Sequence, residues 1–475
     1  MTERVPTGIG GLDSAIEGGF PRGSLILLAG NPGTGKTSFA AQFLLGGAES
    51  GEPGVYVSFA EKRETLLENL SRQLGRDLRK LEEGGELRVL DMATVKEEAL
   101  PATLEAIVNE IQALGAKRLV IDSFTAMAQA FEEPIEARAV VHSILSKLIG
   151  QLGCTTLMIS EVPTGSERIG LGLEEFVADG LIVLRRTRLE DRPFRELEIA
   201  KLRGTRLAQE KMAFTLEGGF RAFPTFEERP IEKRGRFQPI PDPPGKFSSG
   251  CAELDRILGG GYERGSTILL EVEHWISTIQ YQMVISPTIW NFLSHGRAVI
   301  IVPSPGVDHL LAKRRISEGA IPEATIDGLL RICVQKEAGA KEEPCIFKVE
   351  GKDIWEDHRK CSEVAEEFAM RGNGPVLSIV GIASLVNRYG FDQAVRVLNT
   401  EATKTRGWGG LTLLLLKPSR EDLRRELGAI ADAHLKMIRE HGVPIIYGLK
   451  PRTGLYAVEM DASKGYPMPS LTPIL

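Results

Sequence analysis

One short segment of the chain combines the glycines, the lysine and the hydroxyl group that bind a phosphate. Residues 30–37, GNPGTGKT, fit the pattern G-x-x-x-x-G-K-[ST], directly after the apolar run LILLA and directly before the helix-like TSFAAQFLLGGAE. Glycines let backbone N–H groups close around phosphate oxygens, and the start of a helix adds a favourable dipole. We therefore predict a phosphate-binding loop made of Asn31, Pro32, Gly33, Thr34, Gly35, Lys36, Thr37 and Ser38.

Two carboxylates further along the chain could complete the chemistry of this site. We expect Lys36 to contact the terminal phosphates and Thr37 to bind Mg²⁺, with Asp122, at the end of RLVID, holding the metal through water. Glu61, at the end of GVYVSFAE, is the side chain best placed to orient or deprotonate a water molecule. Both acids have a simpler interpretation, because Asp often caps a helix and Glu is common in a helix's first turn.

The elements that must position these residues alternate regularly between strand and helix. Apolar runs predict strands at 25–30, 54–60, 118–124 and 154–161, and amphipathic segments predict helices at 37–49, 63–75, 101–115 and 137–153. Strict alternation predicts an α/β domain, with a mainly parallel twisted sheet that carries helices on both faces. Ligands of such sheets bind at the carboxyl ends of the strands, where the loop, Glu61 and Asp122 all lie.

The chain repeats this plan once. Residues 7–28 and 249–270 align without gaps and match at about half of their positions, which indicates a duplicated domain. Between the two copies lies a segment rich in proline and charge, which continues neither a helix nor a central strand. We predict one domain at 1–228, a linker at 229–246 and a second domain at 247–475.

The second copy lacks the residues that the first would use on a nucleotide. In the alignment, Trp275, Ser277, Thr278 and Ile279 replace Gly33, Gly35, Lys36 and Thr37. Pro305 aligns with Glu61, and either Val380 or Gly381 aligns with Asp122. A tryptophan and β-branched residues would keep the backbone away from a phosphate, and the charge of the lysine is gone. We therefore expect no nucleotide site in the second domain.

Composition narrows the class of protein. The chain is 42% hydrophobic and 26% charged, as ordinary globular proteins are. It has no apolar run of membrane-spanning length and no signal peptide in MTERVPTGIGG, so we expect a cytoplasmic protein without a membrane partner. The five cysteines form no CxxC pair, which predicts reduced thiols. A net charge of −6 disfavours a dedicated nucleic-acid binder.

The order of these motifs resembles the KaiC family of RecA-superfamily ATPases. The resemblance rests on the phosphate loop, on FAE after the second strand, on IDS, and on EEFVADGLIVLRR followed by LEIAKLRGT, and it is dense over residues 5–225. It implies two tandem RecA-like domains and a hexameric ring with ATP between neighbouring subunits. It also implies that Lys201 and Arg203 reach the γ-phosphate of the adjacent subunit, as an arginine finger does, and that Ser160 lies near that phosphate.

Three sets of residues qualify what the resemblance implies. KaiC domains usually have F-E-E where this chain has Phe59-Ala60-Glu61, which predicts slow turnover. From the sequence alone, Lys201 and Arg203 could also lie on a solvated strand edge. Lys450 and Arg452 keep the corresponding positions of the second copy. They either bind carboxylates across a subunit interface or face solvent, or they receive an acidic segment of a partner or another anion.

The leading hypothesis is a regulatory ATPase that binds Mg²⁺ and ATP in its first domain and hydrolyses ATP slowly. Its second domain would stabilise the ring or present a surface to a regulatory protein partner. Kinase activity is not expected, because autophosphorylation in cyanobacterial KaiC belongs to the second domain, and we expect no ATP site in the second domain of this chain. Two alternatives stay open: a RadA-like ATPase that acts on nucleic acid, and an ATP-binding scaffold without turnover.

Overall fold

The computed structural model describes residues 3–92, 100–128, 153–163, 178–336, 343–418 and 421–475. The chain divides into two compact units. The first contains residues 1–225 together with 441–443 and 473–475, and the second contains residues 226–440 and 444–472. The described residues include no helix that is long and apolar enough to cross a lipid bilayer.

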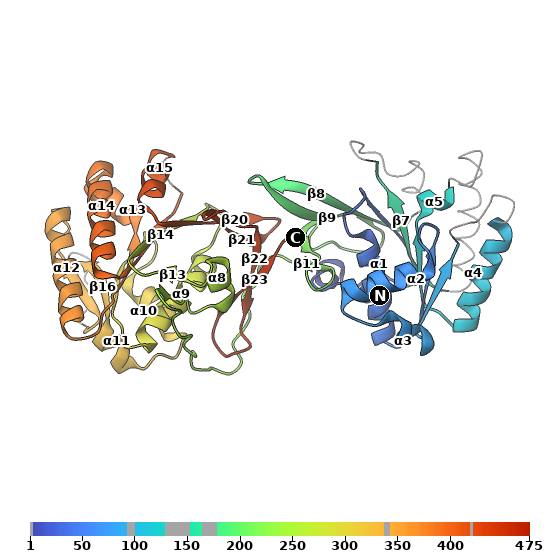
Figure 1. The fold of residues 1–475 in the computed structure, drawn as a ribbon, viewed down its shortest axis with the longest axis horizontal. Helices are drawn as coiled ribbons and strands as arrows, with labels where there is room; N and C mark the ends of the chain where they lie inside the picture. Colours follow the sequence, from blue (N-terminus) through green and yellow to red (C-terminus); the bar gives the residue numbers. More distant parts are fainter. Residues whose placement is uncertain (1–2, 93–99, 129–152, 164–177, 337–342, 419–420) are drawn as a thin grey trace. The chain divides into compact units, whose positions relative to one another are not determined.

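The first unit is built on a nine-stranded sheet (Figure 1). The strand order is β11-β10-β9-β8-β3-β7-β6-β4-β5. Its strands are β3 (Leu25–Gly30), β4 (Gly54–Ser58), β5 (Leu87–Asp91), β6 (Arg118–Asp122), β7 (Thr155–Glu161), β8 (Gly180–Leu189), β9 (Arg192–Leu202), β10 (Lys211–Thr215) and β11 (Arg221–Phe223). The pairs from β8 to β5 are parallel, and β8 to β11 continue as an antiparallel extension.

Helices cover both faces of this sheet. They are α1 (Lys36–Glu49), α2 (Arg63–Leu74), α3 (Leu78–Glu83), α4 (Leu100–Leu114) and α5 (Phe124–Ala128). On one face, Ile26 and Leu28 of β3 pack in one cluster with α1 and α2; on the other, Leu25 and Leu27 pack with Ile107 of α4. The wholly apolar strand β3 is thus buried on both sides, as expected for the centre of a parallel sheet. A short ladder of β1 (Arg4–Val5) and β2 (Phe20–Pro21) stands apart from it.

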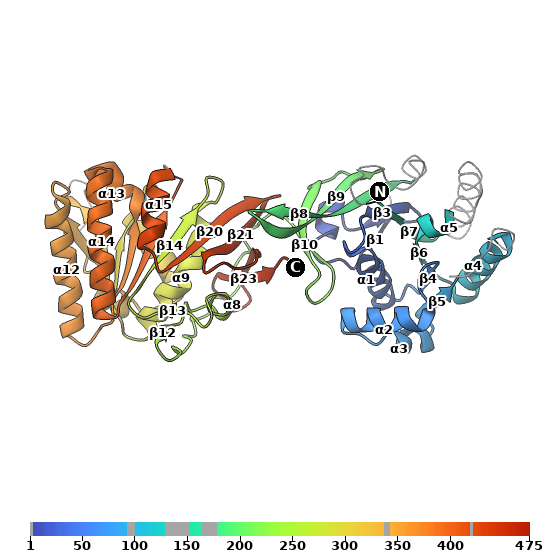
Figure 2. The same cartoon turned by 45° about the horizontal axis from the view of Figure 1, so that its top comes forward.

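The second unit repeats this sheet with one more strand at its edge (Figure 2). The order is β17-β16-β15-β18-β19-β14-β20-β21-β22-β23. The strands are β14 (Ser266–Val272), β15 (Val299–Val302), β16 (Leu330–Gln335), β17 (Ile346–Val349), β18 (Leu377–Gly381), β19 (Leu411–Leu416), β20 (Ala433–Glu440), β21 (Val443–Lys450), β22 (Tyr456–Asp461) and β23 (Met468–Pro473). Strand β14 takes the central place that β3 has in the first unit, and β17 is the added strand.

The helices of the second unit also lie on both faces of its sheet. They are α8 (Ala252–Ile257), α9 (Thr278–Ser294), α10 (His309–Ser317), α11 (Glu323–Leu329), α12 (Ile354–Met370), α13 (Ile382–Tyr389), α14 (Phe391–Trp408) and α15 (Glu421–Ile430). A small ladder joins β12 (Lys246–Phe247) to β13 (Tyr262–Glu263). The predicted fold class, two tandem α/β units with mainly parallel sheets, is confirmed.

The duplication extends to individual contacts. In the first unit Asp179 accepts a hydrogen bond from the backbone N–H of Leu25 at 3.0 Å, and in the second Asp432 accepts one from Thr267 at 2.9 Å. Likewise, Lys201 donates to the carbonyl of Ala178, and Lys450 donates to that of Ala431, both at 2.7 Å. The two sheets therefore begin their central strands with the same polar contacts.

Residues 229–246, where the sequence predicts a linker, carry a buried aromatic side chain. Phe237 is buried in the core of the second unit, and its N–H donates to the carbonyl of Gly319 at 2.9 Å. Oδ1 of Asn291 accepts a hydrogen bond from the backbone N–H of Ile240 at 2.8 Å. This segment forms no helix, because its prolines lack the N–H that a helix needs. Its last residue, Lys246, begins the short strand β12.

Several elements differ from what the sequence predicts. The structure adds the short helix α3, the edge strand β5 and the antiparallel strands β10 and β11. The helix predicted at 137–153 falls almost entirely outside the described residues.

Candidate functional site

The loop after β3 turns on two glycines with left-handed backbone angles. Gly33 has φ of 77° and Gly35 has φ of 102°, conformations that favour residues without a Cβ. Gly30 is needed for a different reason, since a Cβ there would lie 2.6 Å from the carbonyl oxygen of Leu184. The hydroxyl of Thr34 donates to the carbonyl of Asn31 at 2.8 Å. The sequence therefore shapes an open turn that ends at the first residue of α1.

Lys36 lies almost completely inside this turn. Its side chain is 7% exposed, and its ammonium donates to the carbonyls of Gly30 at 2.8 Å and Asn31 at 3.0 Å. Burial lowers the pKa of Lys36, while the charges of Glu161 and Asp122 act to raise it. An ammonium held by backbone carbonyls at a helix start can move to a phosphate without a large rearrangement.

Thr37 and Asp122 meet at the carboxyl end of the sheet. The hydroxyl of Thr37 donates to Oδ2 of Asp122 at 3.1 Å, and the phenol of Tyr56 donates to the same oxygen. Burial raises the pKa of Asp122, an effect opposed by these two hydrogen bonds and by the charge of Lys36. A hydroxyl beside a buried carboxylate is a donor set that suits a small hard cation such as Mg²⁺.

Glu61 lies on the turn that follows β4. Its backbone N–H bonds to the hydroxyl of Ser58 at 3.0 Å, and the same hydroxyl donates to the carbonyl of Glu61 at 2.7 Å. Ala60 and Glu61 are exposed. The charge of Glu61 adds to burial in raising the pKa of Asp122, so the two carboxylates share one electrostatic environment.

Ser160 lies at the same edge of the sheet, near the end of β7. It is fully buried, it pairs in register with Ala29 of β3, and its hydroxyl lies 3.5 Å from that of Thr125. The hydroxyl of Thr125 accepts the backbone N–H of Glu161 at 2.9 Å. The structure therefore brings the phosphate loop, Asp122, Glu61 and Ser160 to one edge.

Lys201 and Arg203 lie at the opposite end of the same sheet. Strand β9 runs antiparallel to β8, and Lys201 pairs with Leu181 beside the beginning of β3. Arg203 is exposed and lies 3.6 Å from Asp179. At about 3.3 Å per residue, the length of β3 separates this pair from its own phosphate loop by roughly 15–20 Å. The predicted finger residues do not belong to the site of their own subunit.

The structure adds three residues that sequence reasoning missed. Tyr56 binds Asp122, Glu161 acts on Lys36 through its charge, and Arg195 donates to the carbonyls of Gly33 at 3.3 Å and Thr34 at 3.4 Å. Glu161 follows Ser160 at the end of an apolar strand, which is a signal that could have identified it. Arg195 comes from a strand remote in sequence, and no local pattern indicates it.

In the second unit the corresponding loop has a different construction. Residues 273–277, EHWIS, contain no glycine, and the side chain of Trp275 is 68% exposed. Ser277 caps α9 by accepting the N–H of Gln280, whose side chain bonds back to the N–H of Ser277. This capping box occupies two N–H groups at the start of the helix, those of Ser277 and Gln280, that would otherwise be open to a phosphate.

The sheet register also decides which residue stands at Asp122. The strand pairs place Val380 where Ile121 stands, and therefore Gly381 where Asp122 stands. A Cβ on Gly381 would lie 2.5 Å from the backbone nitrogen of Ser304. No carboxylate fits at this position without moving the chain of Ser304.

Residues of the first unit fit a nucleotide with a divalent cation. Gly33 faces open space, since a Cβ there would meet nothing within 4 Å. The loop and Lys36 would hold the phosphates, and Thr37 and Asp122 would hold the cation. Bound Mg²⁺ would neutralise phosphate charge. No group of three or more His, Cys, Asp or Glu residues placed to bind a metal occurs among the residues that the structure describes.

Two family models match the chain, one in each of its two units. The family model described as KaiC, ATPase, matches residues 5–220, and the model described as GvpD basic region 2 matches residues 236–318. A crystal structure of a KaiC-like protein from Pyrococcus horikoshii OT3 is 38% identical, with a TM-score of 0.43; the match covers 47% of this chain and 100% of that one.

Curated relatives carry the name circadian clock oscillator protein KaiC. The one from Thermostichus vulcanus is 34% identical over 276 residues, 56% of this chain and 51% of that protein. The one from Synechococcus elongatus is 35% identical over 276 residues, with the same coverage. The chain thus spans about half the length of these two relatives.

A longer match decides the family. A KaiC from Prochlorococcus marinus, strain SARG, is 30% identical over 362 residues, which cover 74% of this chain and 70% of that protein. In the structure, the first unit has a glycine turn, a buried lysine and a hydroxyl-carboxylate pair at one edge of a RecA-like sheet. The chain belongs to the KaiC family of RecA-superfamily P-loop ATPases.

Proposed function

We propose that the first domain binds Mg-ATP at the phosphate loop and hydrolyses it slowly at the interface between subunits of a homo-oligomeric ring, a hexamer by family resemblance. The observation that carries the proposal is the position of Lys201 and Arg203, at the end of the sheet opposite to Lys36. One subunit cannot place both sets of charges on one triphosphate. Two subunits arranged head to tail can do so.

Each residue of the site has a part in this reaction. Lys36 and the backbone of the loop bind the phosphates, and Thr37 and Asp122 bind the cation. Glu61 orients the attacking water, and Ser160 lies close to the terminal phosphate. Lys201 and Arg203 of the neighbour stabilise the charge that develops on the γ-phosphate. Ala60, where the family usually has an acid, makes turnover slow.

The second domain, in this proposal, has no nucleotide site and no kinase activity. The capping box at Ser277 and the contact between Gly381 and Ser304 support this, because neither leaves room for a phosphate or for a metal-binding carboxylate. The domain then serves ring assembly or the binding of a regulatory protein. The nucleotide state of the first domain would change the affinity for that partner.

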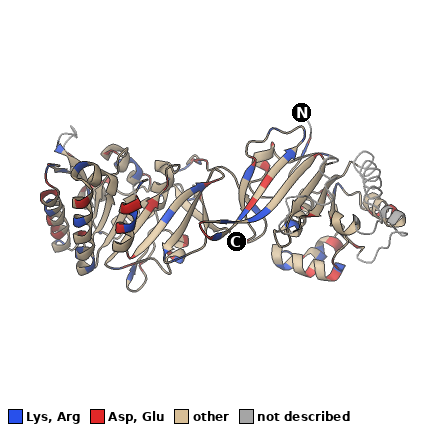
Figure 3. Ribbon diagram, turned by 90° about the horizontal axis from the view of Figure 1, so that it is seen from above, with Lys and Arg blue, Asp and Glu red and all other residues tan. Residues whose placement is uncertain are grey.

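The alternative of a nucleic-acid motor gains no support from the arrangement of charge among the described residues. In Figure 3, Lys and Arg are interspersed with Asp and Glu along the ribbon of both units. Several arginines are paired with carboxylates, among them Arg185 with Glu196 and Glu198. An ATP-binding scaffold without turnover stays the second candidate, and Ala60 is the observation that favours it.

Complementation between variants tests the shared site. We expect Lys36→Met chains and Lys201→Ala/Arg203→Ala chains to be inactive separately. When mixed they should regain about a quarter of the wild-type ATPase rate, because one interface in four then joins an intact loop to intact fingers. Mass in solution with and without Mg-ATP gives the assembly state. A monomer under both conditions, or no recovery from mixed rings of the two variants, would contradict the proposal, and equal background phosphate release from all chains would favour the scaffold.

A further inference from the structure

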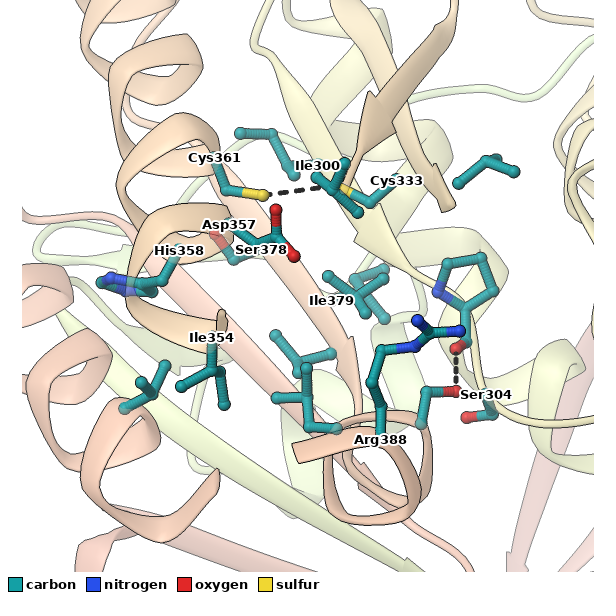
Figure 4. Close-up of a pocket in the computed structure, with 18 of the residues that line it drawn as sticks. Ile300, Ser304, Cys333, Ile354, Asp357, His358, Cys361, Ser378, Ile379 and Arg388 are labelled. Atoms are coloured by element: carbon teal, nitrogen blue, oxygen red, sulfur yellow. Dashed lines mark hydrogen bonds between the residues drawn. The ribbon is translucent and has the colours of Figure 1, made fainter. Parts of the chain in front are cut away.

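The second unit contains a cavity that plays no part in the nucleotide site. It has a volume of about 660 Å³ and lies between the sheet and helices α12, α13 and α14 (Figure 4). Ile300 of β15, Cys333 of β16 and Ser378 of β18 line it from the sheet, and Ile354 and Leu385 line it from the helices. Protein cavities of roughly 300–1,000 Å³ hold small organic ligands.

The packing around this cavity is unlike that on the other face of the same sheet. On the far face the buried apolar side chains form one continuous cluster. On the near face the described apolar residues divide into separate small clusters, around Val380, Ala365 and Ala394. Protein interiors are normally packed as densely as organic crystals, so a hollow of this size between sheet and helices indicates a site.

One residue in the wall of the cavity shows how the two copies of the fold diverged. The sheet register places Ser378 where Leu119 stands in the first unit. Leu119 is fully buried and fills its core. The short polar side chain of Ser378 leaves that volume open to the cavity.

Two polar side chains lie at one end of the cavity, Arg388 and Ser304. Arg388 is anchored by the carbonyl of Gly351 at 3.0 Å and by the side chain of Gln335, which leaves further N–H groups of its guanidinium for a ligand. Ser304 is 6% exposed, and its hydroxyl has no hydrogen-bond partner among the described residues. In Figure 4 the guanidinium of Arg388 points toward the end of the cavity where Ser304 lies.

The carboxylates of the cavity wall are already committed to other groups. Asp357 accepts the N–H of Gly351 at 2.7 Å and the phenol of Tyr389 at 2.7 Å. Oε2 of Glu401 lies 2.9 Å from Nε2 of His358, and Asp308 accepts the N–H of Leu311 at 2.7 Å. A ligand therefore meets an apolar chamber with a cationic donor at one end, beside the buried hydroxyl of Ser304.

We propose that this cavity binds a small amphipathic carboxylic acid, with its apolar body between Ile300 and Leu385 and its carboxylate at Arg388 and Ser304. An apolar body gains by leaving water for the chamber. A carboxylate suits a guanidinium better than a neutral head group does, because charge-assisted hydrogen bonds are the stronger ones.

Displacement of a fluorescent probe tests the proposal on the full-length protein. Anilinonaphthalene sulfonate, an amphipathic aromatic anion, is bound first and then displaced by octanoate or by neutral 1-octanol. We expect octanoate to displace it at concentrations at least about tenfold lower than octanol does, since a charge-assisted hydrogen bond is at stake. Arg388→Gln should abolish that difference, while Arg371→Gln should keep it, because Arg371 is an exposed arginine directly after α12 that pairs with Glu367. Lys36→Met should also keep it, which separates this site from the nucleotide site.

Two further measurements address the location of the ligand. Ser378→Leu should reduce octanoate affinity by filling the cavity. Should this variant fail to fold, the unmodified protein supplies another readout, because Cys361 is half-buried in the cavity wall with its sulfur 3.5 Å from that of Cys333. Saturating octanoate should slow the alkylation of Cys361 by iodoacetamide, measured by mass spectrometry. Equal displacement by octanoate and octanol, absence of probe binding, or unchanged alkylation of Cys361 would each overturn the proposal.

Discussion

Replacing Lys36 with methionine should separate nucleotide affinity from stability. Methionine has a similar length and no charge. The carbonyls that lose the ammonium keep other donors, since Gly30 also accepts the N–H of Val162 at 3.1 Å and Asn31 also accepts the hydroxyl of Thr34 at 2.8 Å. No buried acceptor is left without a partner, and the cost of burying an ammonium disappears. We expect the free energy of unfolding without nucleotide to change by less than about 1 kcal/mol.

With nucleotide the expected effect is large. A hydrogen bond between a charged donor and a phosphate contributes about 1.5–3 kcal/mol, so the variant should bind ATP about 10–100 times more weakly. At an ATP concentration of about 100 times the wild-type Kd, ligand binding stabilises the wild type by about 2.7 kcal/mol. The same concentration is then only about 1–10 times the Kd of the variant, which leaves about 0.4–1.4 kcal/mol.

Titration with a fluorescent ATP analogue measures the Kd, and denaturant unfolding with and without Mg-ATP measures the stabilisation. Lys80→Met on α3, where the lysine is exposed, is the matched control and should behave as wild type. A Lys36→Met protein with wild-type ATP affinity would refute the role assigned to the buried ammonium. A loss of more than about 3 kcal/mol without nucleotide would refute the statement that its carbonyl partners stay satisfied.

Three further predictions follow from the geometry of the two units. Because burial raises the pKa of Asp122, its protonated form favours the folded state below the pKa of the unfolded chain, and this contribution is lost as the pH rises through the higher folded pKa. Mg²⁺ needs the ionised form of Asp122. When Mg-dependent ATP affinity is measured from about pH 7 to pH 5, it should therefore begin to weaken at a higher pH than it would for an aspartate with an ordinary pKa. The variant Asp122→Asn should show no such decline. Ala60→Glu should raise the ATPase rate with a change in stability within about 0.5 kcal/mol, because the site is exposed; an unchanged rate would show that a second acid there is not limiting. Gly381→Asp should destabilise the second unit by about 1–3 kcal/mol or more, and it should not create Mg-ATP binding. The control is Gly328→Asp, which should destabilise the protein less because a Cβ at Gly328 meets nothing within 4 Å. Equal losses of stability in denaturant unfolding would contradict the close contact between Gly381 and Ser304.

Local patterns in the sequence predict the centre of the fold well. Strand β3 is wholly apolar and is followed at once by the glycine loop and α1, so its type and position follow from periodicity and turn chemistry. The position of Gly381 at Asp122 could not be decided from sequence, because the choice between it and Val380 depends on strand register. Register arises from pairing between strands that are remote in the chain.

The same limit applies to residues that join a site from a distance. Arg195 approaches the loop from β9, and Tyr56 reaches Asp122 from a neighbouring strand; each contact exists only after the sheet has formed. The cavity of the second unit is a further case. Its wall includes apolar residues that look like ordinary core in the sequence, and the space between them depends on how three helices settle on the sheet.

The placement of acceptor and donor groups at opposite ends of one sheet has a consequence for assembly. A protomer with its phosphate loop at one end of the sheet and Lys201 and Arg203 at the other would make heterologous contacts with its neighbours. Such contacts either close into a ring or continue as a filament. In the proposed assembly the outcome would depend on the angle between the two ends, which the twist of the central strands between Lys36 and Lys201 would set. Copy number would then be determined by the interior of the sheet, and a substitution in its core could turn closed rings into open chains.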